Sequence, residues 1–146
     1  MKSVIIVLAF AAIAISCTQP QQASYKTERD EVMKFHDVVM EDHGKLIGNQ
    51  IKLDELLKNM PALKKQFPAV DTVKEREAMK GVLGQLNKTE DLMNDWMHQF
   101  EPDVTGKSNE AAVQYFKKEH AKISSIDSIY KIQVKSSTAY LAQFKK

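Results

Sequence analysis

The chain has 146 residues, enough for one domain with its own core, and its 21 Lys and Arg residues nearly balance its 19 Asp and Glu residues. This balance provides no clustered positive charge of the kind that binds phosphates, so no nucleic-acid partner is predicted. Glycine and proline are scarce, with 5 and 4 residues, which favours long helices over an all-β fold. The single cysteine excludes a disulfide within the chain.

Residues 1–17 read MKSVIIVLAFAAIAISC, which has the organisation of a secretory signal. A lysine is followed by an apolar run from Val4 to Ile15 that is too short to span a bilayer. Ala14, Ile15 and Ser16 then precede Cys17, the sole cysteine. We therefore predict a signal peptide over residues 1–16. A plain secretory signal and an uncleaved N-terminal anchor are the alternatives.

The end of this segment resembles the lipobox of bacterial lipoproteins, although Ala14 stands where leucine is most usual. The resemblance implies cleavage before Cys17, diacylglycerol on its sulfur and a third acyl chain, typically palmitate, on its amine. Two or more chains anchor a protein stably, because each buried CH₂ adds about 0.8 kcal/mol. Thr18 stands where aspartate would retain the protein, so the usual sorting rule predicts the outer membrane, with the protein facing the periplasm. Residues 17–26 are predicted to be a lipidated, flexible tether.

Residues 27–60 carry a helical pattern in which apolar side chains share one face and charged side chains occupy the other. Thr27 is the expected N-cap, and Pro61 is expected to end the helix. Gly44 and Gly48 within this helix indicate a local bend or a close contact with another helix. The predicted inward residues are Val32, Phe35, Val39, Leu46, Leu53 and Leu57.

Residues 61–72 contain two prolines and are predicted to connect the first helix to a second one over residues 73–101. Asp71 or Thr72 is the expected N-cap of this second helix. Its apolar residues alternate at spacings of three and four, which is typical of a bundle or coiled-coil seam. The predicted inward residues are Met79, Val82, Leu86, Thr89, Met93, Trp96 and Phe100.

A turn containing Gly106 follows, and Ser108 is the expected N-cap of a third helix over residues 109–143. Three amphipathic helices joined by short loops predict an all-α fold, an up-down-up antiparallel three-helix bundle over residues 27–146. The predicted inward residues of the third helix are Phe116, Ile123, Ile126, Tyr130, Val134, Leu141 and Phe144.

This topology is expected to bring histidines and methionines together in the half of the bundle nearest the N-terminus. If the two loops are centred near residues 66 and 104–105, His36 lies level with Trp96, and His43 lies level with His120. Thioether and imidazole ligands together suit copper, and helical bundles hold metals and cofactors, so copper or haem binding is one hypothesis. The candidate ligands are His43 and His120 first, followed by His36, Met40 and Met93.

Core packing without any cofactor is the alternative explanation of this cluster. Methionine is a flexible core filler, and spacings of three and four occur on any buried helix face. The sequence also contains no compact metal signature such as HExxH or CxxC. Trp96 and Phe100 have the same two interpretations, either core anchoring or an aromatic contact for a hydrophobic ligand or a partner helix.

No catalytic constellation is predicted, and the protein is not expected to be an enzyme. The sequence has no GxSxG nucleophile elbow, and its sole cysteine is assigned to the anchor. His36 and Asp37 are neighbours, as are Asp42 and His43, and neighbouring side chains on a helix are not expected to face each other.

HDVVM at residues 36–40 and LMNDWMHQFEP at residues 92–102 resemble a family of small helical lipoproteins common in Bacteroidota. In that family an HDxVM-like helix precedes an MMxWMxxF-like helix and a long charged helix, and the resemblance covers most of the chain after Cys17. Its members are often labelled "viral A-type inclusion protein", which reflects general helical similarity and implies no viral role. The family has no established activity, so the resemblance implies a fold and a location.

The first functional hypothesis is therefore a membrane-anchored envelope lipoprotein without enzymatic activity. Its helical bundle would bind a partner protein or another envelope component, and it would need no cofactor. The second hypothesis is a periplasmic bundle that binds copper or haem through the cluster of histidines and methionines.

Overall fold

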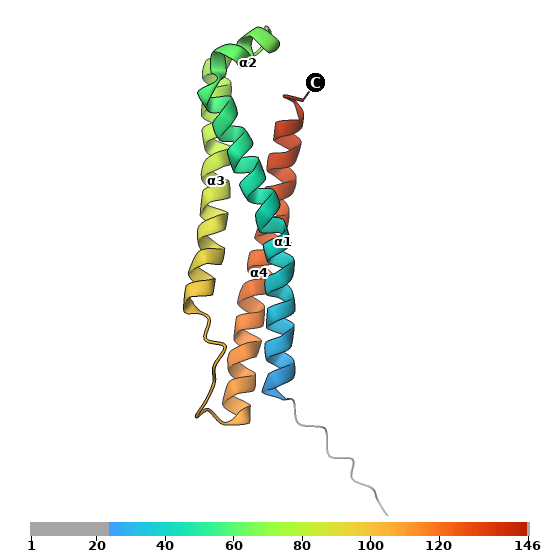
Figure 1. The fold of residues 1–146 in the computed structure, drawn as a ribbon, viewed down its shortest axis with the longest axis vertical. Helices are drawn as coiled ribbons and strands as arrows, with labels where there is room; N and C mark the ends of the chain where they lie inside the picture. The colour runs from blue at the N-terminus through green and yellow to red at the C-terminus, as the bar shows by residue number, and fades with distance from the viewer. Residues whose placement is uncertain (1–23, 146) are drawn as a thin grey trace, which may run out of the picture.

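The structure, a computed structural model, describes residues 24–145, and this part of the chain is all-α, as the sequence predicts. Its helices are α1 (Tyr25–Lys58), α2 (Met60–Gln66), α3 (Thr72–Gln99) and α4 (Asn109–Ala142), and they form a helical bundle (Figure 1). The predicted signal peptide over residues 1–16 and the predicted lipidation site, Cys17, lie outside the described residues. No helix within residues 24–145 has the combination of length and apolar composition that crossing a membrane requires.

The side-chain caps explain where the long helices begin. Asp71 accepts hydrogen bonds from the backbone N–H groups at the start of α3, and Ser108 accepts one at the start of α4, as predicted. The expected cap of α1 was wrong, because Ser24 caps this helix in place of Thr27. The predicted tether over residues 17–26 is therefore too long, since Tyr25 and Lys26 already belong to α1.

The connection between the first two long helices contains the short helix α2, which the sequence did not predict. The backbone breaks at Asn59, and Pro61 lies in the first turn of α2. A proline is favourable there, because the N–H group that it lacks has no helical partner in a first turn. The sequence predicts that Pro61 ends the first helix, but this residue lies at the start of α2, which turns across the end of the bundle (Figure 1).

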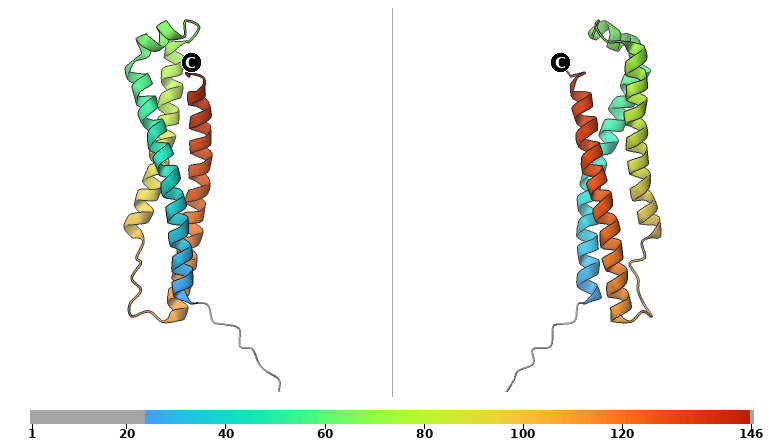
Figure 2. Two further views of the ribbon diagram at one scale, coloured as in Figure 1. Left: turned by 45° about the vertical axis from the view of Figure 1, so that its right-hand side comes forward. Right: turned by 180° about the vertical axis from the view of Figure 1, so that it is seen from behind.

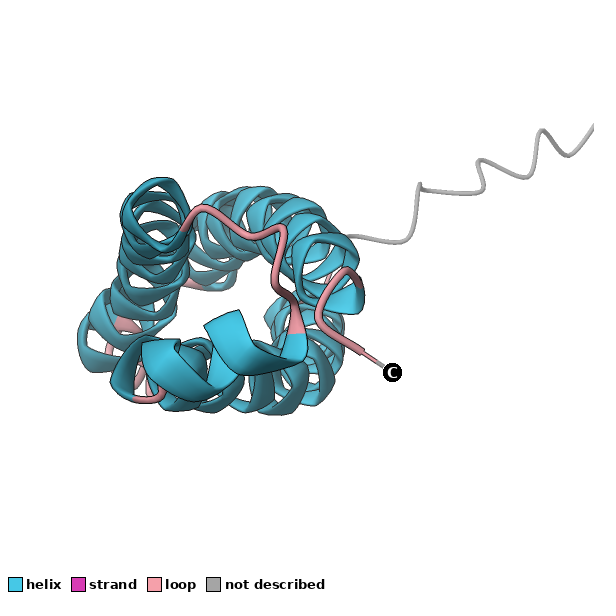
Figure 3. Ribbon diagram, turned by 90° about the horizontal axis from the view of Figure 1, so that it is seen from above, coloured by secondary structure: helices cyan, strands magenta, loops and turns pink. Residues whose placement is uncertain are grey.

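The long helices lie side by side, and hydrogen bonds between them establish their directions (Figures 1 and 2). α1 and α4 are parallel, because contacts from Tyr25 to Asn109 and from Asn49 to Ser137 advance together along both helices. α3 is antiparallel to α4, because Trp96 contacts Glu119 whereas Tyr140 contacts Glu75. Viewed from the α2 end, α1, α3 and α4 surround a common centre (Figure 3).

The core repeats every seven residues along each long helix, which is the period of a left-handed supercoil. The fully buried apolar side chains of α1 are Val32, Val39, Leu46 and Leu53, and those of α3 are Met79, Leu86 and Met93. Phe116, Ile123 and Tyr130 continue the same spacing in α4. Other predicted inward residues pack against this core while remaining partly exposed, namely Phe35, Leu57, Val82, Phe100, Val134 and Phe144.

The segment between α3 and α4, which we call the strap, runs along the bundle without helical structure and then turns at residues 104–107 into α4. α3 ends well before the level at which α4 begins, and residues 100–108 bridge this distance (Figure 1). Val104 in this segment is buried against the core. Gly106 has a φ of 87°, a backbone conformation that glycine adopts without steric cost, and allows the turn into α4.

Candidate functional site

The structure separates the two histidines that were expected to form the first ligand pair. His43 Nδ1 lies 3.1 Å from the hydroxyl oxygen of Tyr130 on α4. His120 instead packs edge-on against Phe35, with ring centroids 4.7 Å apart. Tyr130 lies ten residues beyond His120 on α4, which is about 15 Å along the helix axis. The predicted contact between His43 and His120 is therefore wrong.

The strap explains this error in register. The prediction assumed that the chain turns back symmetrically near residues 104–105. Each extended residue advances by about 3.3 Å, whereas each helical residue advances by only 1.5 Å. The strap over residues 100–108 therefore moves α4 further along the bundle than a compact turn would.

His36 is close to its expected position beside α3. Its ring centroid lies 6.2 Å from that of Trp96, which confirms the predicted level of these two residues. Its Nδ1 atom lies 3.0 Å from Oδ1 of Asp37. The expectation that these neighbours would not face each other was wrong, because the two flexible side chains turn toward each other.

The remaining candidate ligands differ in their accessibility. Met40 is partly exposed on α1, whereas Met93 is fully buried in the core of α3. Met93 is therefore core packing, as the alternative explanation predicted. Within residues 24–145, no group of three or more His, Cys, Asp and Glu side chains has an arrangement that could hold a metal ion.

Trp96 and Phe100 form part of an aromatic cluster at the end of the bundle where α1 begins. Their rings stack with centroids 4.8 Å apart, and Phe100 also contacts Tyr115 and Phe116. The indole Nε1 of Trp96 donates a 2.9 Å hydrogen bond to Oε2 of Glu119, a buried carboxylate on α4. These contacts give both residues a role in holding α3 against α4.

Two tyrosine hydroxyl groups, of the buried Tyr130 and the partly buried Tyr140, have raised pKa values. Burial raises the pKa of the Tyr130 phenol to about 12, and the negative charge of Glu90 adds to the increase. Burial also raises the pKa of Tyr140, and the hydrogen bond that its hydroxyl donates to Glu75 adds to this effect. Both phenols are therefore neutral at physiological pH and act as hydrogen-bonding groups.

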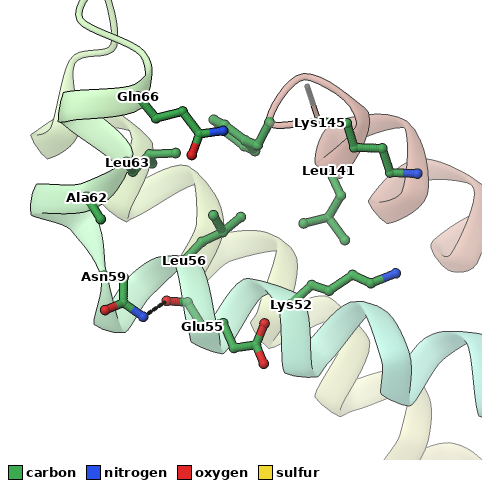
Figure 4. Close-up of a pocket in the computed structure, with 10 residues that line it drawn as sticks. Lys52, Glu55, Leu56, Asn59, Ala62, Leu63, Gln66, Leu141 and Lys145 are labelled. Atoms are coloured by element: carbon green, nitrogen blue, oxygen red, sulfur yellow. Dashed lines mark hydrogen bonds between the residues drawn. The ribbon is translucent and has the colours of Figure 1, made fainter.

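An apolar pocket of about 360 Å³ lies at the opposite end of the bundle, where α2 turns across it (Figure 4). Leu56 from α1, Leu63 from α2 and Leu141 from α4 point into the same space. Phe144 adds an aromatic ring to the lining. We call this hollow the distal pocket, and its remaining lining residues are Lys52, Glu55, Asn59, Ala62, Gln66 and Lys145.

The rim of the distal pocket carries polar groups that are available to a ligand. Among the described residues, no hydrogen bond or ion pair involves the side chains of Lys52, Lys145 or Gln66. Glu55 adds one carboxylate to the same rim. The pocket can therefore accept the apolar part of a ligand, and Lys52 and Lys145 provide two ammonium groups at its rim for an acidic group of that ligand.

The distal pocket was not predicted from the sequence, because it depends on α2. Residues 61–72 were predicted to be a loop, whereas α2 presents Leu63 toward the ends of α1 and α4. A signal was present in the sequence, since Met60 and Leu63 continue the apolar spacing beyond the break and are both buried.

Comparisons with protein-family models, curated proteins and solved structures found no match to this chain.

Proposed function

We propose that this protein is a lipid-anchored component of the bacterial cell envelope whose helical domain binds a ligand and catalyses no reaction. In this proposal residues 1–16 are removed and Cys17 is acylated, placing the protein at the outer membrane facing the periplasm. The domain that follows acts as an up-down-up three-helix bundle, capped at one end by α2. The lipobox-like residues before Cys17 and the resemblance to small helical lipoproteins support this location.

The distal pocket is the observation on which the binding function rests. Its volume of about 360 Å³ lies within the usual range of small-ligand sites, and apolar side chains from α1, α2 and α4 converge in it. α1 starts next to the proposed anchor and has 34 residues, so it extends for about 50 Å toward the pocket. An anchored bundle would therefore hold this pocket away from its own membrane.

The chemistry of the pocket favours an amphiphile with an acyl chain and an acidic head group. Leu56, Leu63 and Leu141 provide an apolar surface for the chain. Lys52 and Lys145 provide positive charge at the rim, where an acidic head group would remain solvated. Acyl chains of this kind are abundant in a cell envelope. We therefore propose an acidic lipid, rather than a partner protein, as the ligand of this pocket.

A fluorescent fatty acid tests this proposal. The core of the bundle is built from residues 25–144, so a chain beginning at Thr18 retains every contact of the described structure. We expect this chain to bind 11-(dansylamino)undecanoic acid at one site, with a blue-shifted emission. The methyl ester of the probe should bind more weakly, because it carries no charge for the lysines.

Matched variants distinguish the pocket from other apolar surfaces. Leu56→Glu should abolish binding of both probes, because it places a carboxylate in the apolar lining. Ile132→Glu is the control, since Ile132 is 61% exposed on α4 and does not line the pocket. Reversing Lys52 and Lys145 to Glu should weaken binding of the acid about tenfold, a change of about 1.4 kcal/mol, and leave the ester unaffected. Saturable binding that survives Leu56→Glu would contradict the assignment, as would the absence of binding.

Metabolic labelling tests the proposed anchor independently. Cells grown with an alkyne fatty acid should label the wild-type protein, and a Cys17→Ala variant should remain unlabelled. Equal labelling of the two proteins would place the lipid elsewhere, and unlabelled wild-type protein would remove the anchor from the proposal.

A further inference from the structure

A second group of side chains, far from the distal pocket, has the chemistry of a metal site. Met33, His36 and Met40 follow one another at spacings of three and four residues, so all three lie on one face of α1. They are accessible, since Met33 and Met40 are each 37% exposed and the His36 side chain is 25% exposed. Two thioethers therefore flank one imidazole at the surface of the bundle.

α3 adds a third thioether at the same level. Trp96 contacts His36, and Met97 is the next residue on α3. Glu90, seven residues before Met97, accepts a hydrogen bond from Gln50 of α1, so this side of α3 faces α1. Met97 is 36% exposed, which places it at the accessible edge of the seam between the two helices.

His36 is already oriented as a ligand. Its Nδ1 atom lies 3.0 Å from the carboxylate of Asp37, and an ionised carboxylate can only accept a hydrogen bond. The proton therefore lies on Nδ1, which leaves the lone pair of Nε2 available. A carboxylate that receives the second N–H of an imidazole is the usual supporting arrangement for a histidine bound to a metal.

The indole ring of Trp96 lies beside His36, and its hydrogen bond to Glu119 holds it in place. Its ring centroid lies 6.2 Å from that of His36, and its N–H is fixed by the buried carboxylate of Glu119. An indole face attracts a nearby cation through its quadrupole. A cation held by His36 would therefore lie close to this ring.

We propose that the imidazole of His36 and the thioethers around it bind one Cu(I) ion. The thioethers are those of Met33, Met40 and Met97. Thioether sulfur is a soft ligand that selects Cu(I), whereas Zn²⁺ and Cu²⁺ favour nitrogen- and oxygen-rich sites. This group shares His36 and Met40 with the ligand set considered from the sequence, but it excludes His43, His120 and Met93.

A titration of the full chain in detergent micelles, under anaerobic and reducing conditions, tests the site. Bicinchoninate competes for Cu(I) and reports affinity by its absorbance. Trp96 is the sole tryptophan of the chain, so its fluorescence provides a second, local signal. We expect one equivalent of Cu(I), or of the redox-inert Ag(I), to quench this fluorescence, and Zn²⁺ to bind much more weakly.

Matched variants connect the metal to the named side chains. His36→Ala and the double variant Met33→Leu with Met40→Leu should each weaken Cu(I) binding by at least about 30-fold, because each removes ligands. Leucine preserves the volume and the apolar character of methionine, so this exchange tests sulfur rather than packing. Asp37→Asn, which removes the carboxylate from the positioning residue, should weaken binding about tenfold.

Met93→Leu and His120→Ala are the controls, and both should retain the affinity of the wild type. Circular dichroism should show the same helical content for every variant. The proposal is overturned if the chain binds no Cu(I), if the Met33 and Met40 double variant retains its affinity, or if His120→Ala loses as much affinity as His36→Ala.

Discussion

Trp96 and Glu119 form a buried polar contact between α3 and α4, with the indole Nε1 2.9 Å from Oε2 of the carboxylate. Both residues are only 5% exposed. The other carboxylate oxygen of Glu119 accepts a hydrogen bond from Lys122 Nζ at 2.8 Å. Two donors, Trp96 Nε1 and Lys122 Nζ, therefore compensate the buried carboxylate of Glu119. The indole ring of Trp96 is the one that lies beside His36.

Replacing this carboxylate by an amide should weaken the bundle measurably. Glu119→Gln removes the negative charge and leaves one acceptor oxygen for two donors, Trp96 Nε1 and Lys122 Nζ, so the free energy of unfolding should fall by about 1 kcal/mol. Glu77→Gln is a matched control, since Glu77 also pairs with a lysine three residues away but is exposed. Its effect should stay below about 0.5 kcal/mol. Urea denaturation followed by circular dichroism measures both, and equal effects would contradict the role of burial.

The contact between His43 and Tyr130 should be visible as an energetic coupling. His43→Ala leaves the phenol of Tyr130 without its partner in the core and should cost about 2 kcal/mol of unfolding free energy. Adding Tyr130→Phe removes the unsatisfied hydroxyl, so the double variant should be more stable than the sum of the single effects predicts, by about 1 kcal/mol.

His120 provides the control for this coupling. His120 packs against Phe35, so the effects of His120→Ala and Tyr130→Phe should add to within about 0.5 kcal/mol. The same denaturation measurements decide between the two pairs. A larger coupling for His120 than for His43 would contradict the placement of Tyr130, rather than His120, beside His43.

The sequence predicted the long helices and most of the core, but it did not predict the register of α4 against α1 and α3. The seven-residue spacing of apolar side chains from Val32 to Leu53 was sufficient to predict a helical bundle and most of its core, because burial follows this period directly. The position of α4 along the bundle axis depends on whether residues 100–108 form a tight turn or run along the bundle. The conformational preferences of these residues do not decide between the two.

The polar core contacts were missed for a different reason. Glu119 lies seven residues from both Ala112 and Ile126, in a column of buried positions. Glu119 was not among the predicted inward residues, because a charged side chain is rarely buried without a partner, and its partner Trp96 lies on another helix. The level of His36 beside Trp96 depends only on the connection between α1 and α3 and was predicted correctly. The partner of His43 on α4 depends also on the connection over residues 100–108, which the sequence did not predict to run along the bundle.

Alkaline pH should destabilise the bundle through Tyr130, which is buried, and Tyr140, which is partly buried. Burial raises the pKa of Tyr130 from its usual value near 10 to about 12, and Tyr140 shifts in the same direction. Above pH 10 the unfolded chain loses these protons while the folded chain retains them, so unfolding becomes more favourable as pH rises. Tyr130 should therefore lower the free energy of unfolding by about 1 kcal/mol per pH unit between pH 10 and 12, below the limiting slope of about 1.4 kcal/mol, and Tyr140 should act in the same direction.

Urea denaturation at several values between pH 8.5 and 11.5 measures this loss. The double variant Tyr130→Phe with Tyr140→Phe should be less stable than the wild type at pH 8.5, because it lacks two hydrogen bonds, and should lose stability more slowly above pH 10. Lysines titrate in the same range, so the difference between the two slopes is the relevant quantity. Identical slopes would contradict the raised pKa values.

Two glycines should respond to alanine in opposite directions. Gly44 lies in the middle of α1, where an added Cβ would meet no atom within 4 Å, so the close helix contact considered from the sequence is absent there. Gly44→Ala should raise the free energy of unfolding by about 1 kcal/mol, because alanine has the higher helix propensity.

An added Cβ at Gly106 would also meet no atom within 4 Å, but the φ of this residue is 87°. Gly106→Ala should therefore lower the free energy of unfolding by about 1 kcal/mol through backbone strain. Urea denaturation of the two variants tests both signs, and a loss of stability in Gly44→Ala would show that another element approaches α1 at this position.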